Sequence, residues 1–104
     1  MRSETNSNAA AVIEAAIAAR RLLRFEYGGY QREVEPYTYG VDRLSQRSLC
    51  GFQRRGGSVS GAASGWKTFH QSDMENVWVM DTAFRAREDY RRNDPGFSVI
   101  VAQV

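Results

Sequence analysis

The strongest constraint on the fold is an alternation of apolar and polar residues that begins after an initial helical segment. In the segment LLRFEY, Leu23, Phe25 and Tyr27 share one face. Arg24 and Glu26 lie on the opposite face. Successive side chains of a strand point to opposite sides, so this pattern predicts a half-buried β-strand. The two glycines that follow predict a turn into a second strand.

Further segments with strand character follow, separated by glycine-rich, polar or charged connections. We expect strands at residues 30–41, 48–53, 66–70, 76–80 and 97–104. Pro36 has no N–H group to donate, so it must lie on a sheet edge or in a β-bulge. One helix followed by five or six short strands predicts a mainly β fold, a small, strongly bent antiparallel barrel.

The N-terminal segment has apolar residues at helical spacing. Asn6, Ser7 or Asn8 can cap a helix there. We expect the helix to run to about Arg21. Its apolar stripe is narrow and rich in alanine, so the helix must pack against the strands to be stable.

The composition is that of an ordinary globular domain, with 104 residues, 42% hydrophobic, 25% charged and a net charge of +2. We expect residues 1–8 to be a disordered tail and residues 9–104 to form a single domain. Cys50 is the only cysteine, which excludes an internal disulfide and favours a reducing, cytoplasmic location. No apolar run approaches the ~18 residues of a membrane span, so we expect no membrane partner.

The motifs that could carry catalysis are incomplete. GAASGWKT resembles a phosphate-binding loop, in which a lysine directly follows a glycine and a helix begins. Here Trp66 separates the glycine from Lys67, and the following TFH has low helix propensity. A reactive Cys50–His70 pair would need an exposed thiol, whereas Cys50 lies within an apolar strand, as inert core thiols do. One histidine and one cysteine cannot form a closed zinc site. We therefore expect no enzymatic activity, no metal and no cofactor.

Tyrosines and arginines occur together in the first two strands. The residues are Tyr27, Tyr30, Tyr37 and Tyr39, with Arg24 and Arg32. Aromatic rings interleaved with arginines can stack bases and hold phosphates. Alternate tyrosines can equally fill the rim of a barrel, and the residues alone leave both interpretations open.

The order of these signals resembles the WYL domain. The resemblance is carried by AIAARRLLRFEY, then REVEP, then WKTFHQSDMENVWV with a phenylalanine after it, and it covers about residues 11–104. It implies an SH3-like or Sm-like barrel. It also implies a bacterial, cytoplasmic module of transcription regulation that binds an anionic ligand, often a nucleotide or single-stranded nucleic acid. Because a single helix precedes the first strand, we expect a divergent, standalone copy without the helix-turn-helix domain that usually accompanies it.

The chain departs from the family pattern where the resemblance places the ligand. The tripeptide that names the family falls on Arg47, Ser48 and Leu49, so only the leucine is kept. The ligand-facing arginines fall on Lys67, His70 and Asp73. The first position keeps its charge, the second is charged only part of the time near pH 7, and the third reverses its charge.

The resemblance therefore implies an altered anion site. We expect Lys67 and His70 to hold the ligand, assisted by Arg32 or Arg47, with Tyr37 available for stacking. In a plain strand Lys67 and His70 would point to opposite faces, so they converge only if a bulge or bend lies between them.

The expected function is a non-enzymatic, WYL-like ligand-sensing domain that binds an anionic small molecule or, weakly, single-stranded nucleic acid. The alternative is a protein-interaction or assembly module with a degenerate ligand site. Sm-like barrels expose strand edges, and the alanine-rich helix could pack on a protein partner or on a second copy of the chain.

Overall fold

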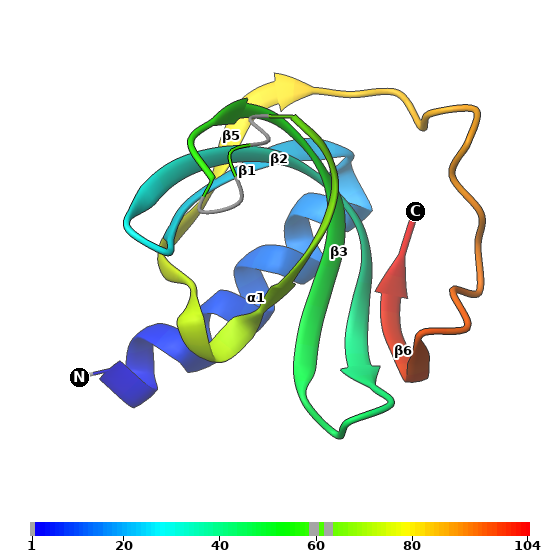
Figure 1. Ribbon diagram of the computed structural model, residues 1–104, viewed down its shortest axis with the longest axis horizontal. Coiled ribbons are helices and arrows are strands. Elements are labelled where there is room, and N and C mark those ends of the chain that lie inside the picture. The colour runs from blue at the N-terminus through cyan, green and yellow to red at the C-terminus, as the bar shows by residue number, and fades with distance from the viewer. Residues whose placement is uncertain (1, 59–60, 62–63) are drawn as a thin grey trace.

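The structure is a computed structural model that describes residues 2–58, 61 and 64–104, with side chains from residue 8 onward. A helix is followed by six strands and one short 3-10 turn (Figure 1). The elements are α1 (Arg2–Ala19), β1 (Arg21–Tyr27), β2 (Tyr30–Asp42), β3 (Arg47–Gly56), β4 (Gly65–His70), η1 (Gln71–Asp73), β5 (Glu75–Ala83) and β6 (Phe97–Gln103). Within this part of the chain, no helix has the length and apolar character that a membrane span requires.

The six strands form one antiparallel sheet with the order β4-β3-β2-β1-β5, and β6 pairs with β2. The predicted class, mainly β with an N-terminal helix and five or six antiparallel strands, is confirmed. The sheet is not closed into a barrel, however. Among the described residues no ladder joins β4 to β5. Strand β4 pairs with β3 at one edge of the sheet, and β5 pairs with β1 at the other. The short turn η1 connects these two edge strands.

Strand β2 holds the sheet together because it pairs with β1, β3 and β6. In its ladder with β3, Pro36 lies opposite Gly51. The next pair joins Thr38 to Cys50, so Tyr37 is an extra residue on β2. Pro36 therefore lies at a β-bulge, one of the two positions expected for it. A bulge bends its strand and increases the local twist, and Figure 1 shows β2 and β3 curving around α1.

The core lies between α1 and the curved sheet. The helix contributes a stripe of four buried residues, Ala9, Ile13, Ala16 and Ile17. The strands contribute larger side chains, among them Leu23, Phe25, Val34, Leu49 and Phe69. The inward face predicted for the first strand is confirmed, since Leu23 and Phe25 are buried and Tyr27 is half-buried. The opposite face is mixed, because Glu26 is exposed and Arg24 is half-buried.

Gly40 allows β6 to lie close to β2. A Cβ at this position would overlap the backbone carbonyl oxygen of Val99. Backbone cannot move aside as a flexible side chain can, so any larger residue would push β6 away from the second half of β2.

The inward face of β1 can be tested at Phe25, which is 1% exposed and packs edge-on against Phe69 with 5.0 Å between ring centroids. Phe25→Ala removes a buried ring and leaves a cavity, so it should lower the free energy of unfolding by roughly 3–5 kcal/mol. Urea denaturation measures this change. Val99→Ala is the control, because Val99 is 54% exposed and its loss should cost less than about 0.5 kcal/mol. A cost below about 1 kcal/mol for Phe25→Ala would contradict the assigned face.

Candidate functional site

Arg32 is a buried cation at the start of β2, with 4% of its surface exposed. Its Nε and Nη2 donate to the backbone carbonyl oxygen of Tyr27 at 3.2 and 2.9 Å, and its Nη1 donates to Oε1 of Gln53 at 3.3 Å. The guanidinium also lies 5.3, 5.9 and 5.7 Å from the ring centroids of Tyr27, Tyr30 and Phe69. These partners are all neutral, so none of them balances its charge.

The charge of Arg32 persists despite this environment. Burial lowers the pKa of Arg32 from its ordinary value, and the neighbouring Tyr27 and Tyr30 oppose that shift. An arginine remains protonated at neutral pH even when buried. Arg32 is therefore a fixed positive charge held among aromatic rings.

Lys67 lies on the same inward face of the sheet. The ladder between β3 and β4 is regular, so Lys67 shares its face with Phe69, two residues further along β4. Its Nζ donates to Oγ of Ser58 at 3.3 Å, and its side chain is half-buried. The Phe69 ring centroid also lies 5.7 Å from the Arg32 guanidinium, so Lys67 and Arg32 share the inward face of the sheet.

Neither cation has an acidic partner within the described residues. The ion pairs found there join Arg21 to Asp81, and both Arg54 and Arg87 to Glu35. A buried charge without a counter-ion is costly, and an anion bound from solution would reduce that cost. We call Arg32, Lys67 and the rings of Tyr27 and Tyr30 the inner cationic cluster.

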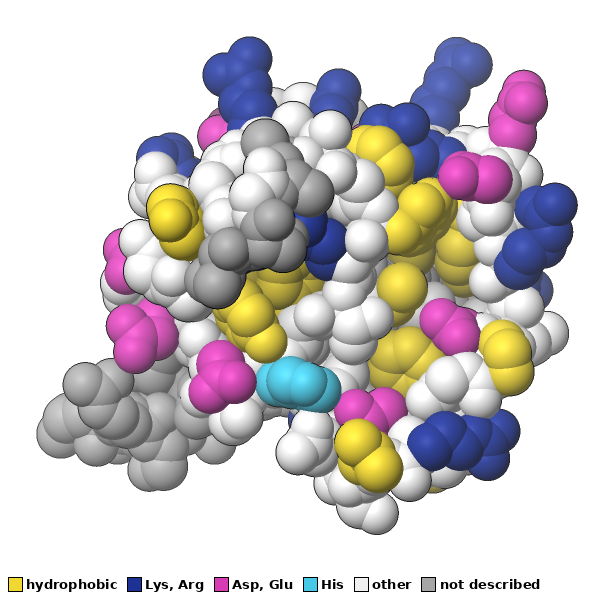
Figure 2. Space-filling model, in the orientation of Figure 1, with side chains coloured by type: hydrophobic (Ala, Val, Ile, Leu, Met, Phe, Trp, Pro, Cys, Tyr) yellow, Lys and Arg dark blue, Asp and Glu magenta, His cyan; other side chains and the backbone are white. Residues whose placement is uncertain are grey.

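His70 lies on the other face of β4, since no bulge interrupts the ladder between Lys67 and His70. Its Nδ1 is 3.2 Å from Oγ of Ser48, and that hydroxyl donates to Oδ2 of Asp42 at 2.8 Å. Because Ser48 gives its proton to Asp42, Nδ1 of His70 is the donor to Ser48. Figure 2 shows the histidine at the surface with acidic side chains on either side. The structure thus does not bring Lys67 and His70 together.

The His70–Ser48–Asp42 chain differs from a hydrolytic triad. In such a triad the histidine lies between the serine and the carboxylate, so that it can take the serine proton. Here Ser48 lies in the middle. Asp42 also accepts hydrogen bonds from the backbone N–H groups of Gln46 and Leu44. The Gln46 bond is the main cause that lowers the pKa of Asp42 from its usual value, and the Ser48 bond and the His70 charge act in the same direction. These hydrogen bonds stabilise the turn between β2 and β3.

The two other residues proposed from the sequence lie away from the inner cationic cluster. Arg47 is exposed, and its Nη1 is 3.4 Å from the hydroxyl of Tyr39. It lines a shallow cleft of about 330 Å³ beside Gln71. Tyr37 is fully buried, so its ring offers no free surface for stacking. Tyr30, which is 44% exposed and lies beside Arg32, does offer one.

Tyr37 belongs instead to a buried polar network around Glu35. Its hydroxyl donates to Oε1 of Glu35 at 2.8 Å and accepts the backbone N–H of Arg87 at 2.9 Å. Arg87 binds both carboxylate oxygens of Glu35, at 3.0 and 3.1 Å. Burial raises the pKa of Tyr37 above its usual value, and the Glu35 bond adds to this shift. The network fastens residues 84–96, the connection between β5 and β6, onto the sheet.

Asp73, the position of charge reversal, is exposed at the end of η1. It lines a small recess of about 140 Å³ together with Glu26 and Glu75. Asp73 is therefore grouped with other acids at the β1–β2 turn, which would repel an anion approaching from that side.

The sequence did not single out Gln53 or the pair Glu35–Arg87. Gln53 follows an apolar strand segment and is fully buried. A buried polar side chain normally has a hydrogen-bond partner in the interior. Glu35 precedes a proline within a strand, and its partner lies 52 residues further on. No pattern in the sequence links two residues so far apart.

Comparisons with known proteins relate the chain to part of a longer protein. No family model and no curated protein matches the chain. Among solved structures, the chain is similar to proteasome accessory factor B/C (PafBC) of Arthrobacter aurescens, with a TM-score of 0.63 and 26% sequence identity. The likeness covers 81% of this chain and 13% of that chain. The protein thus resembles a small part of PafBC, over most of its own length.

The reactivity of Cys50 can be predicted from its surroundings. Burial raises the pKa of its thiol to about 11, and the negative charge of Asp94 contributes. At pH 8 the reactive thiolate should then be roughly 200-fold scarcer than in a free cysteine, whose pKa is about 8.5. Iodoacetamide labelling followed by mass spectrometry should be correspondingly slow for the native protein and should accelerate about tenfold per pH unit up to pH 10. Labelling at the free-cysteine rate in urea is the control, and equally fast native labelling would contradict the assignment.

Proposed function

We propose that the protein is a non-catalytic regulatory domain that binds an anionic ligand through Arg32 and Lys67. The likeness to part of PafBC, a WYL-domain-containing transcription regulator, supports the regulatory role. A nucleotide or a single-stranded nucleic acid is the ligand class that we propose, because it combines phosphates with bases that can stack. The sequence resemblance to the WYL domain led to the same class.

The observation that carries this proposal is the uncompensated charge of the inner cationic cluster. Arg32 uses three of the five N–H groups that a guanidinium offers, and all three go to neutral oxygens. Lys67 has only the Ser58 hydroxyl as a partner among the described residues. A phosphate can accept the remaining donors of both side chains, and arginine suits phosphate oxygens because its planar fork binds two of them at once.

The aromatic side of the proposed site is Tyr30. Its ring is accessible, lies beside the Arg32 guanidinium, and can stack on a base. Tyr30 takes the role expected for Tyr37, which is buried. His70 and Arg47 lie outside the cluster, so we propose that they contact only a ligand long enough to extend past the sheet, such as an oligonucleotide.

A protein-interaction function is favoured by a different observation. Strand β6 pairs with β2 on one side, and its Val99 and Val101 side chains are 54% and 41% exposed. An exposed strand with apolar side chains can pair with another chain. This alternative predicts self-association or binding of an extended peptide, and it does not involve Arg32 or Lys67.

Binding of a single-stranded oligonucleotide tests the proposed function. Lys67→Gln removes one phosphate contact and should weaken binding about tenfold, the effect of about 1.4 kcal/mol. It should also reduce the slope of log affinity against log salt by about 0.7. Fluorescence anisotropy at several salt concentrations measures both quantities. Arg32→Lys keeps the charge but loses the fork, so it should weaken affinity while leaving the salt slope nearly unchanged.

Arg92→Gln is the matched control, since Arg92 is exposed on the connection between β5 and β6. It removes the same charge and should leave the affinity within about twofold. Equal effects of Lys67→Gln and Arg92→Gln would mean that the oligonucleotide responds only to net charge. Absent binding together with a dimer in sedimentation would favour the interaction module.

A further inference from the structure

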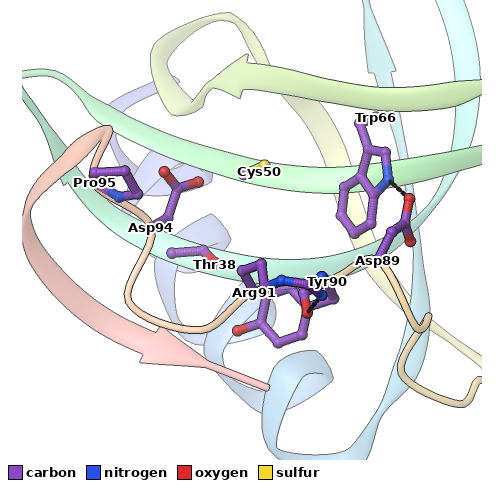
Figure 3. A pocket seen from close by; sticks show the side chains of 8 residues that line it. All are labelled: Thr38, Cys50, Trp66, Asp89, Tyr90, Arg91, Asp94 and Pro95. Carbon is purple, nitrogen blue, oxygen red and sulfur yellow. Dashed lines mark hydrogen bonds between the residues drawn. The ribbon is translucent and has the colours of Figure 1, made fainter.

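A cleft of about 360 Å³ lies on the face of the sheet opposite the inner cationic cluster, under residues 84–96 (Figure 3). Trp66 of β4 lines it, whereas the adjacent Lys67 points to the other face. Strands β2 and β3 supply its floor, and the connection between β5 and β6 supplies its outer wall. Its volume lies within the range of small-molecule sites, roughly 300–1,000 Å³.

One end of the cleft is aromatic. The rings of Trp66 and Tyr90 are nearly parallel, with 22° between their planes and 6.5 Å between centroids. The Tyr37 ring packs behind both of them, at 4.8 and 4.7 Å, and fixes their positions. Trp66 is 37% exposed, so part of its ring faces the opening. The electron-rich face of an indole ring attracts organic cations.

Two carboxylates line the same cleft. Oδ2 of Asp89 accepts the indole N–H of Trp66 at 2.8 Å, and Oδ1 of Asp94 accepts the backbone N–H of Gly96 at 2.8 Å. Figure 3 shows Asp89 beside Trp66 and Asp94 toward the opposite end. Within the described part of the chain, neither carboxylate is ion-paired.

The single basic residue of the lining does not neutralise these acids. Arg91 donates from Nη1 to the backbone carbonyl oxygens of Glu88 and Tyr90, at 3.0 and 3.2 Å. With two aspartates and one arginine, the lining keeps a net negative charge. The cleft therefore attracts cations, in contrast to the inner cationic cluster.

Thr38 places a polar group in the floor of the cleft. It is 1% exposed and lines the floor of the cleft between Asp94 and Tyr90 (Figure 3). Its hydroxyl oxygen can accept a hydrogen bond from an N–H group of a ligand in the cleft.

We infer that this cleft binds a small aliphatic amine or guanidinium compound. The cationic group lies against the Trp66 ring and Asp89, the alkyl chain covers the floor, and a second cationic group, where present, reaches Asp94. The Thr38 hydroxyl accepts an N–H of the ligand. This inference does not depend on the proposed anion site, because the two lie on opposite faces of the sheet.

Nuclear magnetic resonance of the ¹⁵N-labelled chain tests the inference, with agmatine as the probe in an amine-free buffer. Agmatine carries a guanidinium at one end of a four-carbon chain and an ammonium at the other. The indole N–H signal of Trp66 and the amide signals of residues 89–94 should shift and saturate below about 10 mM. The indole signal of Trp78, on β5, should stay in place. Absence of a saturating Trp66 shift would overturn the inference.

Three variants locate the binding. Asp94→Asn and Thr38→Val should each raise the dissociation constant at least fivefold, because the first removes the negative charge that attracts the cationic group and the second removes the hydroxyl acceptor. Asp81→Asn is the matched control, since it removes one acid from the exposed face of β5 and should leave the constant unchanged. If Asp94→Asn and Asp81→Asn weaken binding of the probe equally, the effect comes from net charge alone and the proposed site is rejected. A neutral amide of similar length must cause no comparable shift, and an equal shift would show that the cleft does not select cations.

Discussion

The bulge at Tyr37 in β2 is the constraint on which the rest of the structure depends. Because β2 pairs with β1 before the bulge and with β6 after it, the change in direction separates the two halves of the sheet. The extra residue also turns the Tyr37 hydroxyl toward Glu35 and the backbone of Arg87. Pro36 makes a regular ladder unfavourable at this point, since it has no N–H to donate. Pro36 thus lies at one of the two irregularities of the β2–β3 ladder, beside the anchor for residues 84–96.

The Glu35–Arg87–Tyr37 network then determines which surfaces are available. It holds residues 84–96 over the outer face of β3 and β4, and the Arg87 guanidinium lies 3.5 Å from the centre of the Phe52 ring. Residues 84–96 thereby form one wall of the cleft beside Trp66. They do not cover the inward face near Arg32, which lies on the opposite side of the sheet. Removing one member of a buried charged network leaves the others unsatisfied. The same contacts therefore stabilise the fold and define the outer cleft.

Much of the fold could be predicted from the sequence, because it depends on local patterns. Alternation in LLRFEY, the paired glycines after it and the polar bend at residues 71–73 located the strands. The open edge between β4 and β5 could not be predicted, since closure depends on pairing between distant segments. The candidate site could be predicted only in part. The charges of Arg32 and Lys67 are evident from the sequence. The burial of Tyr37 and the position of His70 on the other face of β4 depend on how the strands pair. The boundary between a tail at residues 1–8 and a domain at residues 9–104 stays a prediction.

The placement of Trp66 and Lys67 on one short edge strand has a thermodynamic consequence. These neighbours face opposite sides of β4, which is hydrogen-bonded only to β3 among the described strands. If both proposed sites bind their ligands, a ligand that shifts or rigidifies β4 from one side changes the free energy of binding on the other. Such coupling is reciprocal, so an anion that strengthens cation binding must itself be bound more strongly when the cation is present. A strand of six residues could in this way transmit a signal through the thickness of the sheet, without any movement of the rest of the domain.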